Sequence, residues 1–170
     1  NGNDTKSLNF ILDNIKGGII TFPTPLLPDE EVQIDGIDDN LSSLVIINSN
    51  TKNDVEFKGD KLILKTDINI KGALGEVIGK IDISEEGNLI KMADSCSKTI
   101  EENIKIAVNK VQKDYGIDMF GFGVIFHKKY PEHWQEMKDN WDEVFADANF
   151  EIEVETRILR TGLINQTVIE

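Results

Sequence analysis

The two histidines of the chain are the first residues to consider as ligands for a metal ion. His127 and His133 are six residues apart with Pro131 between them, which is not the i, i+4 spacing that places two ligands on one helical face. His133 and Glu136 are three apart and supply half of a metal site. Neither a cysteine pair nor a further ligand at a recognised spacing completes it, so the sequence favours ordinary surface histidines over a metal centre.

The single cysteine is the second candidate for chemistry, as a nucleophile. Cys96 falls in a series of apolar residues spaced three and four apart, so it belongs to the apolar stripe of a helix. Nothing near it would generate a thiolate, which is the reactive form. We therefore expect a buried packing residue. A lone cysteine cannot form an internal disulfide, so cysteine usage does not indicate whether the protein works in an oxidising or a reducing compartment.

Known motifs give no support for an enzyme. Residues 35–40 (DGIDDN) offer oxygen ligands for calcium, but they do not match the EF-hand spacing, so a solvated acidic turn is favoured. Residues 120–123 (FGFG) are too short for the dinucleotide fingerprint, and neither a nucleophile elbow nor a phosphate-binding loop is present. The sequence thus predicts a protein with no catalytic residue, no cofactor and no metal.

Composition predicts one globular domain, with 170 residues of which 39% are hydrophobic. A formal charge of -13 repels phosphate, which argues against nucleic acid as a partner, and it also keeps the fragment soluble. The longest stretch without charged or strongly polar residues, residues 119–126, is far below the roughly 20 residues that cross a bilayer. Because the chain begins with Asn1 and lacks a secretory signal pattern, we expect that it was excised from something longer or processed.

The elements that must position these residues follow from hydrophobic spacing. Residues 62–70 alternate apolar and polar side chains, as in a long half-buried antiparallel strand. Residues 84–115 carry the strongest helical pattern of the chain. The other expected elements are helical turns within 1–16, strands at 19–22, 44–47, 55–57 and 150–158, an acidic strand and turn at 29–39, and a hairpin turn at 59–60.

The aromatic stretch predicts two short helices that meet at a bend. Asp118 is a suitable N-cap for the first, and Pro131 suits the first turn of the second. We expect the second helix to continue beyond residue 141, because Trp134, Met137, Trp141 and Val144 fit one helical face. Glycines 121 and 123 each cost a helix about 1 kcal/mol relative to alanine, so they indicate close backbone packing or a special dihedral angle.

Taken together, several short motifs resemble one known family. They are FGFG at 120–123, HKKYP at 127–131, Trp134, Asn140-Trp141 and RTG at 160–162, preceded by GALGE at 72–76 between a long strand and a long helix. Their order and content resemble the C-terminal domain of Ger(x)C (GerAC-type) spore germination lipoproteins, which are the C subunits of spore germinant receptors. The resemblance covers most of the chain.

The resemblance implies an α+β fold, in which a long amphipathic helix and two shorter helices pack on a largely antiparallel β-sheet. It implies a single domain over residues 1–170, with 1–16 as a segment leading in from a missing N-terminal region. It also implies a protein held by a lipid anchor, absent here, on the outer face of the spore inner membrane. Its partners would be the integral-membrane A and B subunits of the receptor, and the family has no assigned catalytic residues.

Two positions depart from the pattern of that family. Val124 stands where a polar or acidic residue is expected, and Leu159 stands where a second basic residue often precedes RTG. Both leave the fold untouched. They put in doubt that the partner surface matches that of other members.

Three functional hypotheses remain open at this point. The first is a non-catalytic subunit in receptor assembly or signal relay. Its candidate partner-binding residues are Phe120, Gly121, Phe122, Gly123, Tyr130, Pro131, Trp134, Trp141 and Arg160. The same aromatic residues and glycines also suit a helix-on-sheet core, and Arg160 suits an ion pair with a nearby carboxylate. The second hypothesis is an extracytoplasmic module that binds a small-molecule or cation germinant, which requires a pocket with convergent polar groups. The third is an unrecognised hydrolase.

Overall fold

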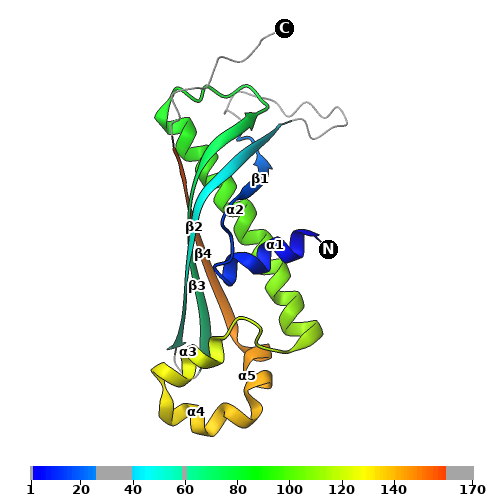
Figure 1. Cartoon of the computed structure of the whole chain (residues 1–170), viewed down its shortest axis with the longest axis vertical. Coiled ribbons are helices and arrows are strands. Elements are labelled where there is room, and N and C mark those ends of the chain that lie inside the picture. The colour runs from blue at the N-terminus through cyan, green and yellow to red at the C-terminus, as the bar shows by residue number, and fades with distance from the viewer. Residues whose placement is uncertain (1, 26–39, 59–60, 160–170) are drawn as a thin grey trace.

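The computed structural model describes residues 2–25, 40–58 and 61–159 of the chain. Its centre is a four-stranded sheet with the strand order β1-β2-β3-β4 (Figure 1). The strands are β1 Gly18–Pro23, β2 Leu41–Lys58, β3 Lys61–Val77 and β4 Asn149–Ile158. The pairs β1–β2 and β2–β3 are antiparallel, and β4 runs parallel to β3. The predicted α+β fold with a largely antiparallel sheet is confirmed.

Strand β2 is one element of 18 residues, where the sequence predicted two short strands. The register against β3 shifts between Ile46 and Asn48, which is a β-bulge that leaves one extra residue in β2. Before the bulge even-numbered side chains such as Ile46 are buried, and beyond it the buried side chain is Val55. Because the bulge exchanges the two faces, the alternation of polar and apolar residues breaks in the sequence although the strand continues.

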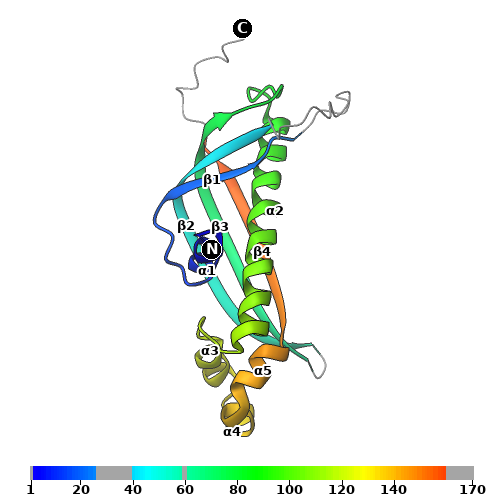
Figure 2. The same ribbon diagram turned by 90° about the vertical axis from the view of Figure 1, so that its right-hand side faces the viewer.

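One face of the sheet is covered by helices, as Figure 2 shows. Helix α2, Glu86–Lys110, lies against β4 and β1 and contacts α1, Gly2–Ile11. A π-helical turn, η1 Val111–Tyr115, continues α2 and ends at Gly116 with φ 61°. The buried stripe of α2 includes Cys96, Ile100, Ile104 and Val108, which confirms the predicted amphipathic helix. No described helix is long and apolar enough to cross a membrane.

The outer edge of β4 is closed by side chains of α2. Ser97 Oγ accepts a hydrogen bond from the Thr156 backbone N–H at 3.0 Å, and Glu101 Oε1 accepts one from the Val154 backbone N–H at 3.3 Å. These bonds satisfy donors that an edge strand would otherwise offer to another chain.

Helix α1 is tied to the opposite edge of the sheet. The Thr51 hydroxyl donates to the Phe10 carbonyl at 2.6 Å, and the Thr51 backbone N–H donates to Asp13 Oδ1 at 2.9 Å. Phe10 and Ile11 are buried in the core. The segment predicted to lead into the domain therefore packs as part of this fold.

A cluster of short helices closes the end of the sheet where β2 meets β3 and β4 begins (Figure 1). It consists of α3 Phe122–Lys129, α4 Pro131–Met137, the 3-10 turn η2 Lys138–Asn140 and α5 Trp141–Asp147. We call these residues, 122–147, the helical cap. The bend at Pro131 is where the sequence predicted it. The prediction of one continuous second helix is wrong, because η2 interrupts it and allows α5 to bury Trp141 and Phe145.

Three sequence predictions fall outside the described residues. They concern the acidic stretch at 29–39, the hairpin turn at 59–60 and Arg160. The strands on either side of the hairpin turn are antiparallel, with Lys58 opposite Lys61.

Candidate functional site

The carboxylate of Asp118 organises the start of the helical cap. Its Oδ1 accepts backbone N–H groups of Phe120 at 3.2 Å, Gly121 at 3.0 Å and Phe122 at 3.2 Å. Its Oδ2 accepts the Gly123 N–H at 2.6 Å and the indole Nε1–H of Trp141 at 3.0 Å. One side chain thus satisfies the free donors at the start of α3 and ties α3 to α5. The sequence predicted Asp118 as the N-cap residue, but Gly121 occupies that position and Asp118 caps the helix from three residues before it. The sequence gave no sign of the bond to Trp141.

The two glycines of the FGFG element have separate reasons to be glycine. Gly121 precedes α3 with φ 81°, a left-handed conformation that side chains rarely adopt. Gly123 is buried against Trp141, and a Cβ atom there would lie 2.7 Å from Trp141 Nε1. The sequence-based expectation of a special dihedral angle and of close packing is met at one position each.

Aromatic rings from the cap and the sheet form a connected cluster. The rings of Phe126 and Trp141 stack with centroids 5.1 Å apart, and Phe126 lies 5.9 Å from Phe57 of β2. Phe122 meets Phe150 of β4 at 5.5 Å in an edge-to-face arrangement. Such pairs add about 0.5–1.5 kcal/mol beyond the area they bury. The cluster therefore anchors the cap to the sheet.

The candidate partner-binding residues divide by exposure. Phe120, Phe122, Gly123 and Trp141 are buried, and Gly121, Tyr130 and Trp134 are half-buried. Pro131 is exposed, and Arg160 lies outside the described residues. Except for Arg160, the structure brings the predicted residues together in and around the cap. Sequence reasoning missed Phe57 and Phe150 as members of this cluster, because both come from strands distant in the chain.

The two histidines lie on the cap surface and contact aromatic rings. The ring of His127 stacks on Trp134 at 5.4 Å, while that of His133 lies 5.3 Å from Phe57. Within the part of the chain that the structure describes, no three histidine, cysteine, aspartate or glutamate side chains group as a possible metal site.

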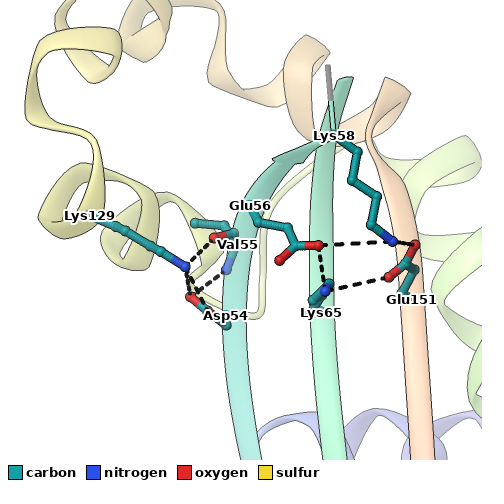
Figure 3. Close-up of polar contacts among 7 residues, drawn as sticks. All are labelled: Asp54, Val55, Glu56, Lys58, Lys65, Lys129 and Glu151. Carbon is teal, nitrogen blue, oxygen red and sulfur yellow. Dashed lines mark hydrogen bonds and ion pairs between the residues drawn. The ribbon is translucent and has the colours of Figure 1, made fainter. Parts of the chain in front are cut away.

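A lysine of the cap is bound to the edge of β2. Lys129 Nζ lies 2.8 Å from both carboxylate oxygens of Asp54 and donates to the Val55 carbonyl at 2.7 Å (Figure 3). The hydrogen bond from Lys129 lowers the pKa of Asp54, and the bond to Asp54 raises the pKa of Lys129. This contact holds α3 against a strand edge that β1 does not cover.

Replacing Lys129 with methionine should lower the free energy of unfolding at neutral pH by about 0.2–1 kcal/mol, because the pair is solvent-exposed. The folded-state pKa of Asp54 is depressed, so its contribution is present above its ordinary pKa of 3.8 and is lost as pH falls through the folded value. The folded-state pKa of Lys129 is raised, so its contribution is present below 10.5 and is lost as pH rises through the folded value. Urea unfolding of both proteins at pH 7 and pH 3 measures this difference.

Lys128→Met is the matched control, since Lys128 is exposed and makes no ion pair with a described residue. The ion pair between Lys129 and Asp54 would be contradicted if both variants lost equal stability. It would also be contradicted if the loss in Lys129→Met were no smaller at pH 3 than at pH 7.

A second ion network lies on the open face of the sheet (Figure 3). Lys65 bridges Glu56 and Glu151, and Lys58 Nζ lies 2.6 Å from Glu151 Oε1, so β2, β3 and β4 are linked across their width. Ile63 lies opposite Glu56 on this face and is only 3% exposed. The stems of the charged side chains are placed to cover it.

Cys96 is fully buried on α2, and burial raises the pKa of its thiol to about 12. We expect the folded protein to react with iodoacetamide at pH 8 far more slowly than the urea-unfolded protein, since only the thiolate attacks. Mass spectrometry of alkylated Cys96 measures both rates. Similar rates in the two states would show that the thiol is accessible in the folded protein.

Three exposed apolar side chains lie within residues 117–124, in and just after the turn that wraps around Asp118. Ile117 is 58% exposed, Met119 51% and Val124 59%. The turn is tight, with the Met119 N–H bonded to the Ile117 carbonyl at 2.9 Å and the Val124 N–H to the Gly121 carbonyl at 3.1 Å. We call Ile117, Met119 and Val124 the apolar turn.

Comparison with known proteins identifies the family. The family described as Spore germination B3/GerAC like, C-terminal, matches residues 1–162. The chain belongs to this family. The resemblance found in the sequence is thereby confirmed, and the GerAC-like domain is part of a group of spore germination proteins.

Curated relatives and a solved structure agree with this assignment. The GerAC-like domain is 30% identical over 127 residues to spore germination protein KC of Bacillus subtilis (strain 168), covering 74% of this chain and 31% of the relative. It is 23% identical over 164 residues to spore germination protein B3 of the same organism, covering 96% and 40%. The crystal structure of the GerBC protein superposes with a TM-score of 0.75 at 19% identity, covering 92% of this chain and 45% of that one. The chain thus spans less than half the length of these relatives.

Proposed function

We propose that this GerAC-like domain is a non-catalytic part of a spore germinant receptor and acts in receptor assembly or signal relay. The observation that carries this proposal is the apolar turn, in which three large apolar side chains are more than half exposed at the start of the helical cap. Large apolar residues held in one exposed turn are typical of a surface that another protein covers. Family membership supports the receptor as the setting.

In this proposal the candidate residues have two roles. The buried residues, among them Phe122, Gly123 and Trp141, hold the cap in a fixed shape. Tyr130, Pro131 and Trp134 reach the surface and contact the partner together with the apolar turn. Arg160 is proposed as a further contact residue. Docking would shift the population of receptor states, without performing chemistry, if the partner binds this surface more tightly in one state than in the other.

The proposed partners are the integral-membrane A and B subunits of the receptor. The proposed location is the outer face of the spore inner membrane, where a lipid anchor on the full-length protein would hold the domain beside those subunits. A charge of -13 on the chain disfavours direct binding to anionic headgroups, which supports protein partners over the lipid surface itself.

Spores that express the full-length protein with Ile117→Asp and Met119→Asp test the proposal. Both side chains are exposed, so the domain should fold, while the new charges should block docking and slow the response to germinant. Ile90→Asp is the control, because Ile90 is 57% exposed near the start of α2 at the opposite end of the molecule. Normal germination with the double variant at normal protein level would refute the proposal.

A further inference from the structure

A groove lies between the helical cap and the neighbouring ends of β2, β3 and β4. Its volume is about 410 Å³, which is within the range of small-molecule sites. Its lining comes from the ends of β2, β3 and β4 and from α4, η2 and α5, and consists of Phe57, Lys61, Leu62, Met137, Asn140, Glu143, Val144, Asp147, Ala148 and Asn149.

Part of the groove is apolar. Leu62 is buried, and Phe57, Met137 and Val144 are half-buried and pack against the core. These side chains leave some apolar surface facing the groove. A ligand with a small apolar body would remove that surface from water, which is worth about 25 cal/mol per Å².

The helical wall of the groove carries two carboxylates. Glu143 and Asp147 are four residues apart on α5, so they lie one turn apart on the same side of the helix. Both line the groove, and neither forms a hydrogen bond or ion pair with any residue in the described part of the chain. A cation placed between them would therefore not have to displace a lysine or arginine.

The walls are fixed by contacts outside the groove. Gln112 Nε2 donates to the carbonyls of Phe145 at 2.8 Å and Ala148 at 3.0 Å, which holds the end of α5. The ring of Phe57 is held by Tyr130 at 5.2 Å and by Phe126 at 5.9 Å. The groove is therefore formed before any ligand arrives, which reduces the cost of binding.

We propose that this groove binds small amphipathic amines, with the ammonium group at Glu143 and Asp147 and the apolar body on Phe57, Leu62 and Val144. A further polar group on the ligand would find hydrogen-bonding side chains in the groove lining, namely Lys61, Asn140 and Asn149. The proposal does not depend on the receptor role, because none of the three residues of the apolar turn lines the groove.

Titration of the ¹⁵N-labelled 170-residue chain with isopentylamine, followed by NMR, tests the proposal. We expect saturable shifts at the amides of residues 140–149, and no saturable shift with 4-methylpentanoate, which has the same body but a negative charge. Ethanolamine, which has the amine but no apolar body, should bind at least about tenfold more weakly. Equal binding of the carboxylate or of ethanolamine would overturn the proposal.

Glu143→Gln combined with Asp147→Asn should weaken isopentylamine binding at least about tenfold, since hydrogen bonds to a charged group are being removed. Glu102→Gln combined with Glu153→Gln is the matched control, because it removes the same charge from exposed positions that do not line the groove. Equal weakening by both pairs, or shifts scattered over the acidic surface, would mean that the amine responds to net charge alone and would overturn the proposal.

Discussion

Replacing Asp118 with alanine is expected to lower the free energy of unfolding by about 2–4 kcal/mol. The carboxylate accepts four backbone N–H groups and the indole N–H of Trp141. Loss of a helix cap costs about 0.5–2 kcal/mol, and donors left without an acceptor add to that loss. Urea unfolding followed by tryptophan fluorescence measures the change, because Trp141 reports the cap directly.

Two further variants define the role of Asp118. Asp118→Asn keeps one oxygen but turns an NH₂ group toward donors, so it should recover only part of the lost stability. Asp139→Ala removes an exposed acid of the cap that has no hydrogen-bond partner among the described residues, and it should change stability by less than about 0.5 kcal/mol. If Asp118→Ala were as mild as Asp139→Ala, the carboxylate would not organise the cap.

Gly123→Ala is expected to destabilise the domain by about 1–3 kcal/mol, although alanine is the better helix former. The new Cβ atom would lie 2.7 Å from Nε1 and 3.0 Å from Cε2 of Trp141. The indole cannot easily move away, because it is stacked on Phe126 and bonded to Asp118. Thermal unfolding of the variant measures the cost.

Gly87→Ala provides the matched control in the first turn of α2. A Cβ atom at Gly87 meets nothing within 4 Å, so the substitution should be neutral or should stabilise by up to about 1 kcal/mol. If both glycine variants were more stable than the parent protein, the close packing of Gly123 against Trp141 would be contradicted.

The parts of the fold that could be predicted are those with a regular hydrophobic period. The helical spacing from residue 84 onward predicted α2, and the predicted apolar stripe is buried from Cys96 to Val108, whereas Leu89 and Ala93 near the start of the helix are only half-buried. The alternation of apolar and polar residues over 62–70 predicted β3, and the same alternation over 150–158 predicted β4. In each case one face of a single uninterrupted element is buried, so the local pattern carries the information.

The parts that could not be predicted depend on contacts between distant residues or on a local break in the period. The bulge after Ile46 exchanges the faces of β2, and the η2 turn breaks the helical face shared by Trp134 and Trp141. The bond between Asp54 and Lys129 joins residues 75 positions apart, and nothing in the sequence near either residue indicates it.

For the candidate site, the residue types indicated which positions are structurally constrained, but they did not indicate which side chains are exposed. The two glycines indicated constrained backbone, and each has a physical reason in the structure. The aromatic pattern left open whether Phe122 and Trp141 form a core or a partner surface, and the structure buries both while Met119 and Val124 are exposed. The groove was also hidden, since its walls come from three strands and the cap.

Site-specific photo-crosslinking in spore membranes tests the central claim most directly. A photoreactive amino acid at position 124, within the apolar turn, should give an adduct with an integral-membrane receptor subunit. The same amino acid at position 90, which is equally exposed at the far end of α2, should not. Adducts at both positions, or at neither while the protein is present at its normal level, would contradict docking through the helical cap.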